Sequence, residues 1–253
     1  IPVVIAIGVN FGNLYTINEY GKYSTRGKSD LVSNDKVRSK GLDRDYIVSW
    51  SYGIDETMNL LIPNYKGGST KPFDKNSETV KALRQNNAGS AVNQVMKYWG
   101  TQPNTEGPHY MGAIVIFLFI LGIVVLKGNE KWWLLIATVL SVMLAWGKNF
   151  MPLTNLFIDF FPGYNKFRAV TMILIIAQFC IPLMGFLALR DFYNGTLTKK
   201  DMMKGLKIAG GITGGILLFI LLFPGIAGSF LNSYEKDYPS WLTQALVSDR
   251  KAL

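Results

Sequence analysis

The chain has 253 residues, a formal net charge of +9 and only 17% charged side chains. Its single cysteine (Cys180) and single histidine (His109) exclude an internal disulfide and any metal cluster built on several such residues. Polar residues dominate up to residue 110, whereas long uncharged runs follow from Met111 onward. This distribution is typical of a membrane protein, and positive charge beside apolar runs points to lipid headgroups rather than to nucleic acid.

The first segment, residues 1–17, opens with the apolar run IPVVIAIGV. This run is too short to cross a bilayer, carries no basic n-region and precedes no small-residue cleavage pattern, so we do not interpret it as a signal peptide. We expect it to be the outer end of a truncated transmembrane helix followed by an exit segment. On this interpretation the chain is an internal fragment of a longer protein.

Residues 18–110 form the largest polar region, and we predict an ordered extracytoplasmic loop region that is irregular or helical. Within it, Ser77–Asn86 is predicted as a short helix, because Ser77 suits the N-cap and Val80 and Leu83 lie three residues apart. No alternating run is long enough to predict a sheet.

Residues 111–231 are predicted to form a transmembrane bundle. Its candidate spans are the four apolar runs at about 111–127, 132–147, 169–189 and 208–231.

Several residues refine these spans. Pro182 predicts a kink in the third run, and Gly210/Gly214 with Gly211/Gly215 in the fourth predict a helix-packing face.

Between the second and third runs, Pro152 and Asn155 interrupt an apolar stretch, which predicts a re-entrant or interfacial segment over residues 148–168. Lys148 is expected to snorkel to the interface. Residues 232–253 are predicted to be an extracytoplasmic segment leading to a missing next span.

Loop charge predicts the orientation of the bundle. The links at 127–131 and 190–207 are rich in lysine and arginine, and short basic loops stay in the cytoplasm. Alternation then places residues 18–110, 148–168 and 232–253 outside. The expected fold class is an all-α polytopic membrane protein.

Two acidic pairs in the polar region could carry chemistry. Asp43 and Asp45 are either two surface carboxylates or an Asp-x-Asp motif that could bind a divalent cation. The sequence does not firmly imply any cofactor. Asp55 and Glu56 either suit the dipole at the start of a helix or act as a general base or hydroxyl-binding group for a sugar. Nearby aromatic residues offer faces on which a sugar could stack: Trp50, Tyr52, Tyr65 and Phe73.

The stretch FPGYNKFRAV, residues 161–170, places Lys166 and Arg168 at the outer end of the third span. The positive-inside tendency does not favour cations there. Arginine binds phosphate oxygens through its planar fork and lysine adds a point charge, so these residues, with Tyr164 of the same turn, are candidate contacts for a lipid-linked phosphate. The alternative is snorkelling against ordinary lipid phosphates.

Four segments carry a family resemblance: WSYGIDETMNLLIPNYKGGS, AWGKNFMPL, FPGYNKFRAVTM and YPSWLTQALVSDRKAL. Together they resemble the YfhO-like family of bacterial membrane proteins over essentially the whole chain. The resemblance implies a multi-pass protein of the bacterial cytoplasmic membrane with a GT-C-like helical bundle. It also implies a polyprenyl-phosphate-linked sugar donor used at the outer face. The catalytic carboxylate of such enzymes usually lies in the first outer loop, which would precede Ile1.

The sequence therefore supports two functional hypotheses. The first is a membrane glycosyltransferase that moves a sugar from a polyprenyl-phosphate donor to a cell-envelope glycopolymer or lipid. The second is a non-enzymatic membrane protein, either an envelope-assembly scaffold or a transporter. Apart from Lys127, at which the first run stops, the four predicted spans contain no charged residue, which counts against ion-coupled transport through this part of the protein.

Overall fold

The structure of the chain is a computed structural model that describes residues 2–21, 23–24 and 42–253. The described residues form helices joined by turns and irregular segments and contain no strand, although Pro72 and Met96 form an isolated antiparallel bridge.

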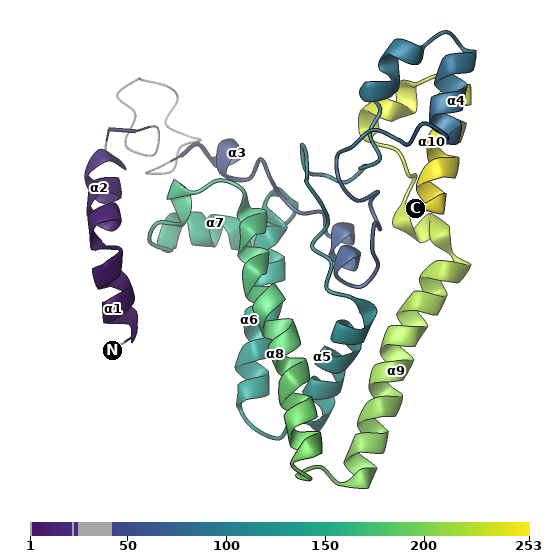
Figure 1. The fold of residues 1–253 in the computed structure, drawn as a ribbon. Coiled ribbons are helices and arrows are strands. Elements are labelled where there is room, and N and C mark those ends of the chain that lie inside the picture. Colours follow the sequence, from purple (N-terminus) through teal and green to yellow (C-terminus); the bar gives the residue numbers. More distant parts are fainter. Residues whose placement is uncertain (1, 22, 25–41) are drawn as a thin grey trace.

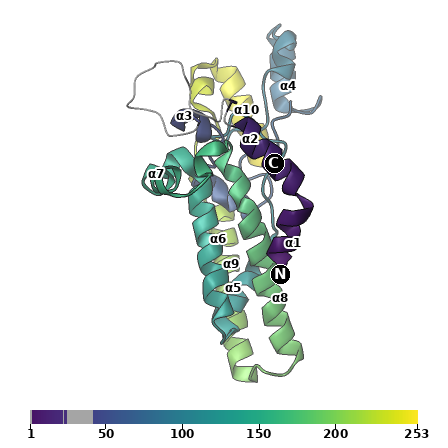
Figure 2. The ribbon, with the colours of Figure 1, turned by 90° about the vertical axis from the view of Figure 1, so that its left-hand side faces the viewer.

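The apolar second half of the chain forms a bundle (Figure 1). Its helices are α5 (Ala113–Val125), α6 (Glu130–Ala145), α8 (Leu174–Tyr193) and α9 (Lys199–Leu222). The links from α5 to α6 and from α8 to α9 lie at one end, the link end, in both views (Figures 1 and 2). The polar segments gather at the opposite end, the polar end.

Two helical segments are long and apolar enough to cross a membrane. They are the 24-residue stretches Val170–Tyr193, which joins η5 (Val170–Ile173) to α8, and α9. A third span results if α6 and the segment after it are counted as one, across a bend of 112°. These helices confirm the all-helical class and agree with a membrane protein, whereas the GT-C-like arrangement stays a prediction.

Close packing between the bundle helices depends on small residues. Gly122 of α5 lies directly against Met184 of α8, and a side chain at Gly122 would overlap it. At the link end, Gly205 of α9 packs against Leu121 and Val125 of α5 in the same way. Such small residues let helix backbones approach closely, which is the usual way that helices pack in lipid.

The predicted glycine face of α9 makes almost no contact within the described part of the chain. A side chain built at Gly211, Gly214 or Gly215 would meet nothing within 4 Å there, and Gly210 faces only Phe117. The reason is that α9 packs on α5 near the link end and diverges from the bundle toward its other end (Figure 1).

The start of α9 also differs from the prediction. The Thr198 side chain accepts a hydrogen bond from the Asp201 backbone N–H and caps the helix, which therefore begins at Lys199 rather than near residue 208. The helix ends at Leu222 because Pro224 follows. The basic link predicted over 190–207 thus shortens to a turn, and its charged residues lie on helix ends.

A sharp bend separates α6 from α7 (Met151–Phe160), with η3 (Gly147–Phe150) between them. Gly147 has a positive φ of 47°, and a side chain there would overlap Ser51. The Ser51 Oγ accepts from the Lys148 backbone N–H at 2.8 Å, and the Thr154 hydroxyl donates to the Gly147 carbonyl at 2.9 Å. As a result α7 lies across the bundle axis (Figures 1 and 2), which agrees with an interfacial segment.

Several short helices make up the polar end. They are α3 (Arg44–Ile47), η1 (Asp55–Leu60), α4 (Glu78–Gln85), η2 (Gly89–Asn93), η4 (Tyr164–Lys166), η6 (Pro224–Ala227), η7 (Ser233–Asp237) and α10 (Ser240–Ala252).

The short helix predicted after Ser77 is confirmed as α4. The Ser77 side chain accepts from the Val80 N–H at 3.2 Å and caps the helix. Val80 and Leu83 are buried against Leu242 and Leu246 of α10. A segment of the long polar region is therefore held against the C-terminal helix.

The N-terminal helices α1 (Pro2–Val9) and α2 (Phe11–Gly21) contain no buried residue. They stand beside the bundle with a clear separation (Figure 1).

Candidate functional site

A pocket of about 670 Å³ opens at the polar end of the bundle. Its walls come from four parts of the chain that are far apart in sequence, namely η1 with the following turn, residues 96–103, η3 and residues 227–234. The charged and aromatic residues that line it are Asp55, Lys66, Tyr98, Trp99, Lys148 and Tyr234. Such a concave site with a few polar groups and aromatic faces can hold a small polar ligand such as a sugar.

Two of the residues that line the pocket, Asp55 and Lys66, form an ion pair. The Lys66 Nζ lies 2.5 Å from Asp55 Oδ2, donates to the Ala227 carbonyl at 2.7 Å and lies 3.7 Å from the centre of the Trp99 ring. The Lys66 side chain is 5% exposed, whereas that of Asp55 is 53% exposed. A buried lysine therefore fixes a carboxylate that stays accessible from the pocket.

The turn after Lys66 explains how this lysine reaches the wall. Gly67 and Gly68 both have positive φ angles, of 87° and 78°. A side chain at Gly67 would overlap the Lys97 carbonyl, so only glycine lets these two segments touch. The Trp99 N–H donates to the Lys66 carbonyl at 3.0 Å and completes the contact.

Glu56 is adjacent to Asp55 in sequence but fully buried behind the pocket wall. Its carboxylate accepts hydrogen bonds from the Thr101 N–H at 2.6 Å, the Tyr98 hydroxyl at 3.1 Å and the Gln102 side chain at 3.3 Å. Burial and the negative charge of Glu56 both raise the pKa of Tyr98, which therefore stays a neutral donor. Glu56 shapes the wall through the turn at 98–102, and the geometry leaves direct contact with a ligand to Asp55.

Replacing Glu56 with glutamine is expected to lower the free energy of unfolding by about 1–3 kcal/mol, because an amide group brings donors to positions where the wall already supplies donors. Thermal unfolding of the purified full-length protein measures this effect. The matched control is Asp74→Asn, since the Asp74 side chain is 85% exposed and forms an ion pair with Lys97. Equal behaviour of the two variants would contradict a structural role for Glu56.

The basic turn predicted to hold a phosphate lies outside the pocket lining. Arg168 donates from Nη1 to the Tyr46 hydroxyl at 2.9 Å, and its guanidinium carbon lies 5.0 Å from the centre of the Trp50 ring. Trp50 in turn donates to the Asn104 side chain at 3.4 Å, beside the pocket-lining Pro103. Trp50 therefore connects Arg168 to the pocket rim. Arg168 is exposed and Lys166 is partly exposed.

Tyr164, the third candidate in that turn, packs beside a buried apolar cluster that includes Ile158 and Val170. Burial raises its pKa to about 12. Its hydroxyl has no hydrogen-bond partner within the part of the chain that the structure describes. Its aromatic ring contributes packing to the turn that carries Lys166.

The Asp-x-Asp pair has a structural explanation. The Asp43 side chain accepts from the backbone N–H groups of Asp45 and Tyr46, at 2.9 and 3.2 Å, and caps α3. In residues 2–21, 23–24 and 42–253, no group of three or more His, Cys, Asp or Glu residues could hold a metal ion. The described residues therefore provide no set of ligands for the divalent cation that the Asp-x-Asp pattern suggested.

His109 lies between the polar end and the bundle. Its ring meets the Tyr52 ring edge-on at 5.8 Å between centroids, and its Nδ1 lies 3.1 Å from Gln178 Nε2 of α8. Burial lowers the pKa of His109, so the imidazole is neutral at pH 7. It serves as a polar contact at the boundary between the bundle and the polar end.

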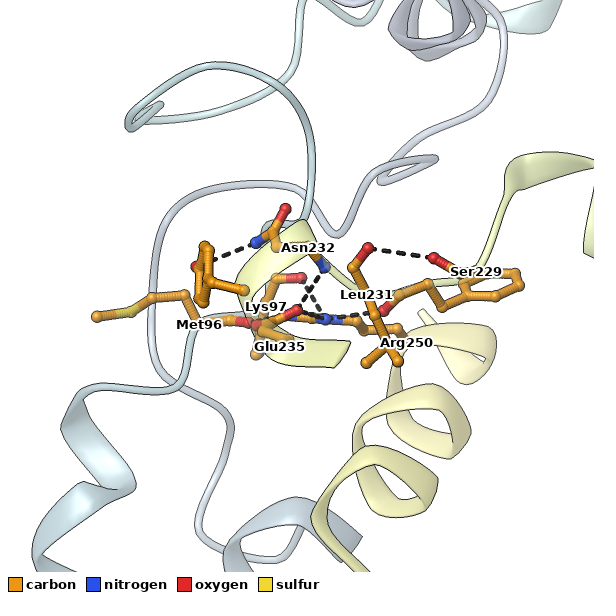
Figure 3. A network of polar contacts seen from close by, with 9 residues as sticks. Met96, Lys97, Ser229, Leu231, Asn232, Glu235 and Arg250 are labelled. Atoms are coloured by element: carbon orange, nitrogen blue, oxygen red, sulfur yellow. Dashed lines mark hydrogen bonds and ion pairs between the residues drawn. The ribbon is translucent and has the colours of Figure 1, made fainter. Parts of the chain in front are cut away.

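A second charged network, which no sequence pattern predicted as a whole, lies behind the pocket lining and is drawn in Figure 3. Arg250 of α10 forms a two-point ion pair with Glu235, at 2.6 and 2.8 Å. The same guanidinium donates to the carbonyls of Met96, Lys97 and Phe230. Arg250 thus joins residues 96–97 to 230–235, two segments that line the pocket. The N-x-x-E spacing of Asn232 and Glu235 signals a capping box and is the one local hint.

Comparisons of the chain with protein-family models, with curated proteins and with solved structures give no match. The resemblance to the YfhO-like family therefore rests on the four sequence segments alone.

Proposed function

We propose that this protein acts as a membrane glycosyltransferase at the outer face of the bacterial cytoplasmic membrane. It would transfer a sugar from a polyprenyl-phosphate-linked donor to a cell-envelope glycopolymer or lipid. The observation that carries the proposal is the accessible Asp55 carboxylate, held by buried Lys66 in the wall of a pocket at the end of an apolar helical bundle. The family resemblance of the sequence supports the same class of enzyme.

The proposed reaction departs from the position that the family resemblance implies for the catalytic carboxylate and uses Asp55, which lines the pocket, as the group that receives a proton. A hydroxyl oxygen of the acceptor bonds the anomeric carbon of the donor sugar, while the bond from that carbon to the phosphate oxygen breaks. The electron pair of the broken bond leaves with the polyprenyl phosphate, and Asp55 accepts the proton of the attacking hydroxyl. The ion pair with Lys66 holds the carboxylate in one position for this step.

The position of the pocket suits a donor that remains anchored in the membrane. α7 lies across the bundle axis at the polar end, as an interfacial helix does, and η3, which precedes it, contributes Lys148 to the pocket. A headgroup at this level could enter the pocket while its hydrocarbon chain stays in the bilayer. The exposed ring of Tyr234 offers an apolar face to the sugar, whereas the Trp99 ring is buried beneath Lys66 and forms part of the wall.

Arg168, which Trp50 connects to the pocket rim, would contribute positive charge as the phosphate departs, and Lys166 of the same turn would add to it. Replacing Arg168 with alanine is expected to lower the rate of sugar transfer from a polyprenyl-phosphate donor by about three- to tenfold, the effect of losing one exposed charge-assisted contact. The assay uses the full-length protein in detergent or vesicles.

The matched control for Arg168→Ala is Arg190→Ala. Arg190 is also exposed but lies at the link end, where it pairs with Asp191. Unchanged transfer by a normally expressed Arg168→Ala variant would end the idea that this residue contacts the donor phosphate. Absence of transfer by the wild-type protein with any lipid-linked donor would favour the scaffold or transporter hypothesis.

A further inference from the structure

We infer that Lys148 is the anion-binding residue of the pocket and that it contacts the phosphate of the lipid carrier. The inference rests on the proposed function in one respect, namely that this phosphate belongs to a sugar carrier. Lys148 lines the pocket and is exposed, whereas Lys166 and Arg168 do not line it.

The charges of the pocket lining favour an anion at Lys148. The charged residues that line the pocket are Asp55, Lys66 and Lys148. Asp55 and Lys66 neutralise each other at 2.5 Å, which leaves one positive charge. Among the described residues, no ion pair involves the Lys148 ammonium group. Glu56 lies behind the wall, and its charge is met by hydrogen-bond donors of residues 98–102.

The backbone holds Lys148 firmly at this position. The positive φ of Gly147 turns the chain out of α6, and the Lys148 N–H donates to Ser51 Oγ at 2.8 Å. The next residue, Asn149, donates from its side chain to the Tyr52 carbonyl at 2.8 Å. These contacts fix the backbone on both sides of the lysine, so its ammonium group is presented to the pocket from a rigid turn.

The location of this turn selects a lipid-borne phosphate. Lys148 follows the apolar helix α6 at the 112° bend to α7, and α7 lies across the bundle axis as an interfacial helix does. A residue at such a bend, between an apolar helix and an interfacial helix, lies at headgroup level, where lipid phosphates are found. The chemical class of the ligand is therefore a phosphate ester with a polyprenyl chain, whose headgroup enters the pocket beside Asp55.

Binding of farnesyl phosphate to the full-length protein tests the inference, with farnesol as the probe that lacks phosphate. We expect wild-type protein to bind farnesyl phosphate at least about tenfold more tightly than farnesol. Lys148→Ala should abolish most of this preference, and Lys148→Arg should retain it. The control is Lys75→Ala, which removes the same charge from an exposed residue outside the pocket.

Three results would overturn the inference. They are an unchanged preference in a folded Lys148→Ala variant, an equal loss in Lys75→Ala, and the absence of any preference in the wild-type protein. If inorganic phosphate competes as strongly as farnesyl phosphate, the ligand of Lys148 is a free anion, and the assignment to a lipid-borne phosphate is overturned. If the preference depends on Lys148 but no donor supports sugar transfer, the proposed function fails and the phosphate site stands.

Discussion

Replacing Arg250 with alanine is expected to destabilise the polar end by about 3–5 kcal/mol, the usual cost of removing one partner of a buried ion pair. The Arg250 and Glu235 side chains are 0% and 2% exposed. Alanine would leave the Glu235 charge buried without its partner. It would also leave the carbonyls of Met96, Lys97 and Phe230 without their donor.

Hydrogen exchange of the full-length protein measures this effect, because faster exchange is expected in α4, α10 and residues 96–103 while the bundle helices stay protected. Lys251→Ala is the matched control, since Lys251 is the exposed neighbour of Arg250. The double variant Arg250→Met with Glu235→Met should recover much of the lost protection, because it buries no unpaired charge. Exchange in Arg250→Ala equal to that in Lys251→Ala would contradict the role assigned to this network.

Local patterns predicted those parts of the fold that local interactions determine. Ser77 caps α4 because its hydroxyl reaches a backbone N–H three residues away, and such a contact can be recognised in the sequence. The start of α9 carried the same kind of signal in Thr198 and Asp201, but the surrounding lysines favoured the interpretation as a loop. The helical class was predictable because long apolar runs favour helices, whereas only two of the four predicted spans, or three if the bent pair counts as one, are long and apolar enough to cross a membrane.

The pocket could be predicted only in part, because its walls depend on contacts between distant segments. The acidic pair Asp55–Glu56 was recognisable as a candidate, but the sequence could not separate an accessible carboxylate from a fully buried neighbour. Lys66 joins the site through the close approach of Gly67 to residue 97, which no local pattern encodes.

Lys148 shows the same limit in another way. The sequence predicted a lysine that snorkels to the interface, which is the usual behaviour at the end of an apolar helix. What places it in a pocket is the positive φ of Gly147 together with the hydrogen bond to Ser51, about a hundred residues away. A backbone conformation of this kind depends on the tertiary contact, so it could not be predicted from residues 146–149 alone.

Replacing Asp55 with asparagine is expected to lower sugar transfer by at least about 100-fold, the typical effect of removing a general base. The amide has nearly the same shape as the carboxylate, so the pocket wall should keep its form while the group can no longer accept the proton. Lys66 retains its hydrogen bond to the Ala227 carbonyl and its contact with the Trp99 ring. We therefore expect a large loss of activity, together with some loss of thermal stability because the buried Lys66 ammonium group loses its counter-ion, so transfer is compared between folded proteins.

The rate of sugar transfer by Asp55→Asn relative to Asp74→Asn is the most direct test of the pocket as the site of transfer. Both substitutions remove an exposed partner of a lysine at the polar end, but only Asp55 lines the pocket. The assay uses a polyprenyl-phosphate-linked donor and the full-length protein. If sugar transfer takes place in the pocket, Asp74→Asn should transfer sugar at nearly the wild-type rate, and Asp55→Asn at no more than about one hundredth of the wild-type rate. Equal transfer by the two folded variants would contradict the assignment of Asp55 and of the pocket.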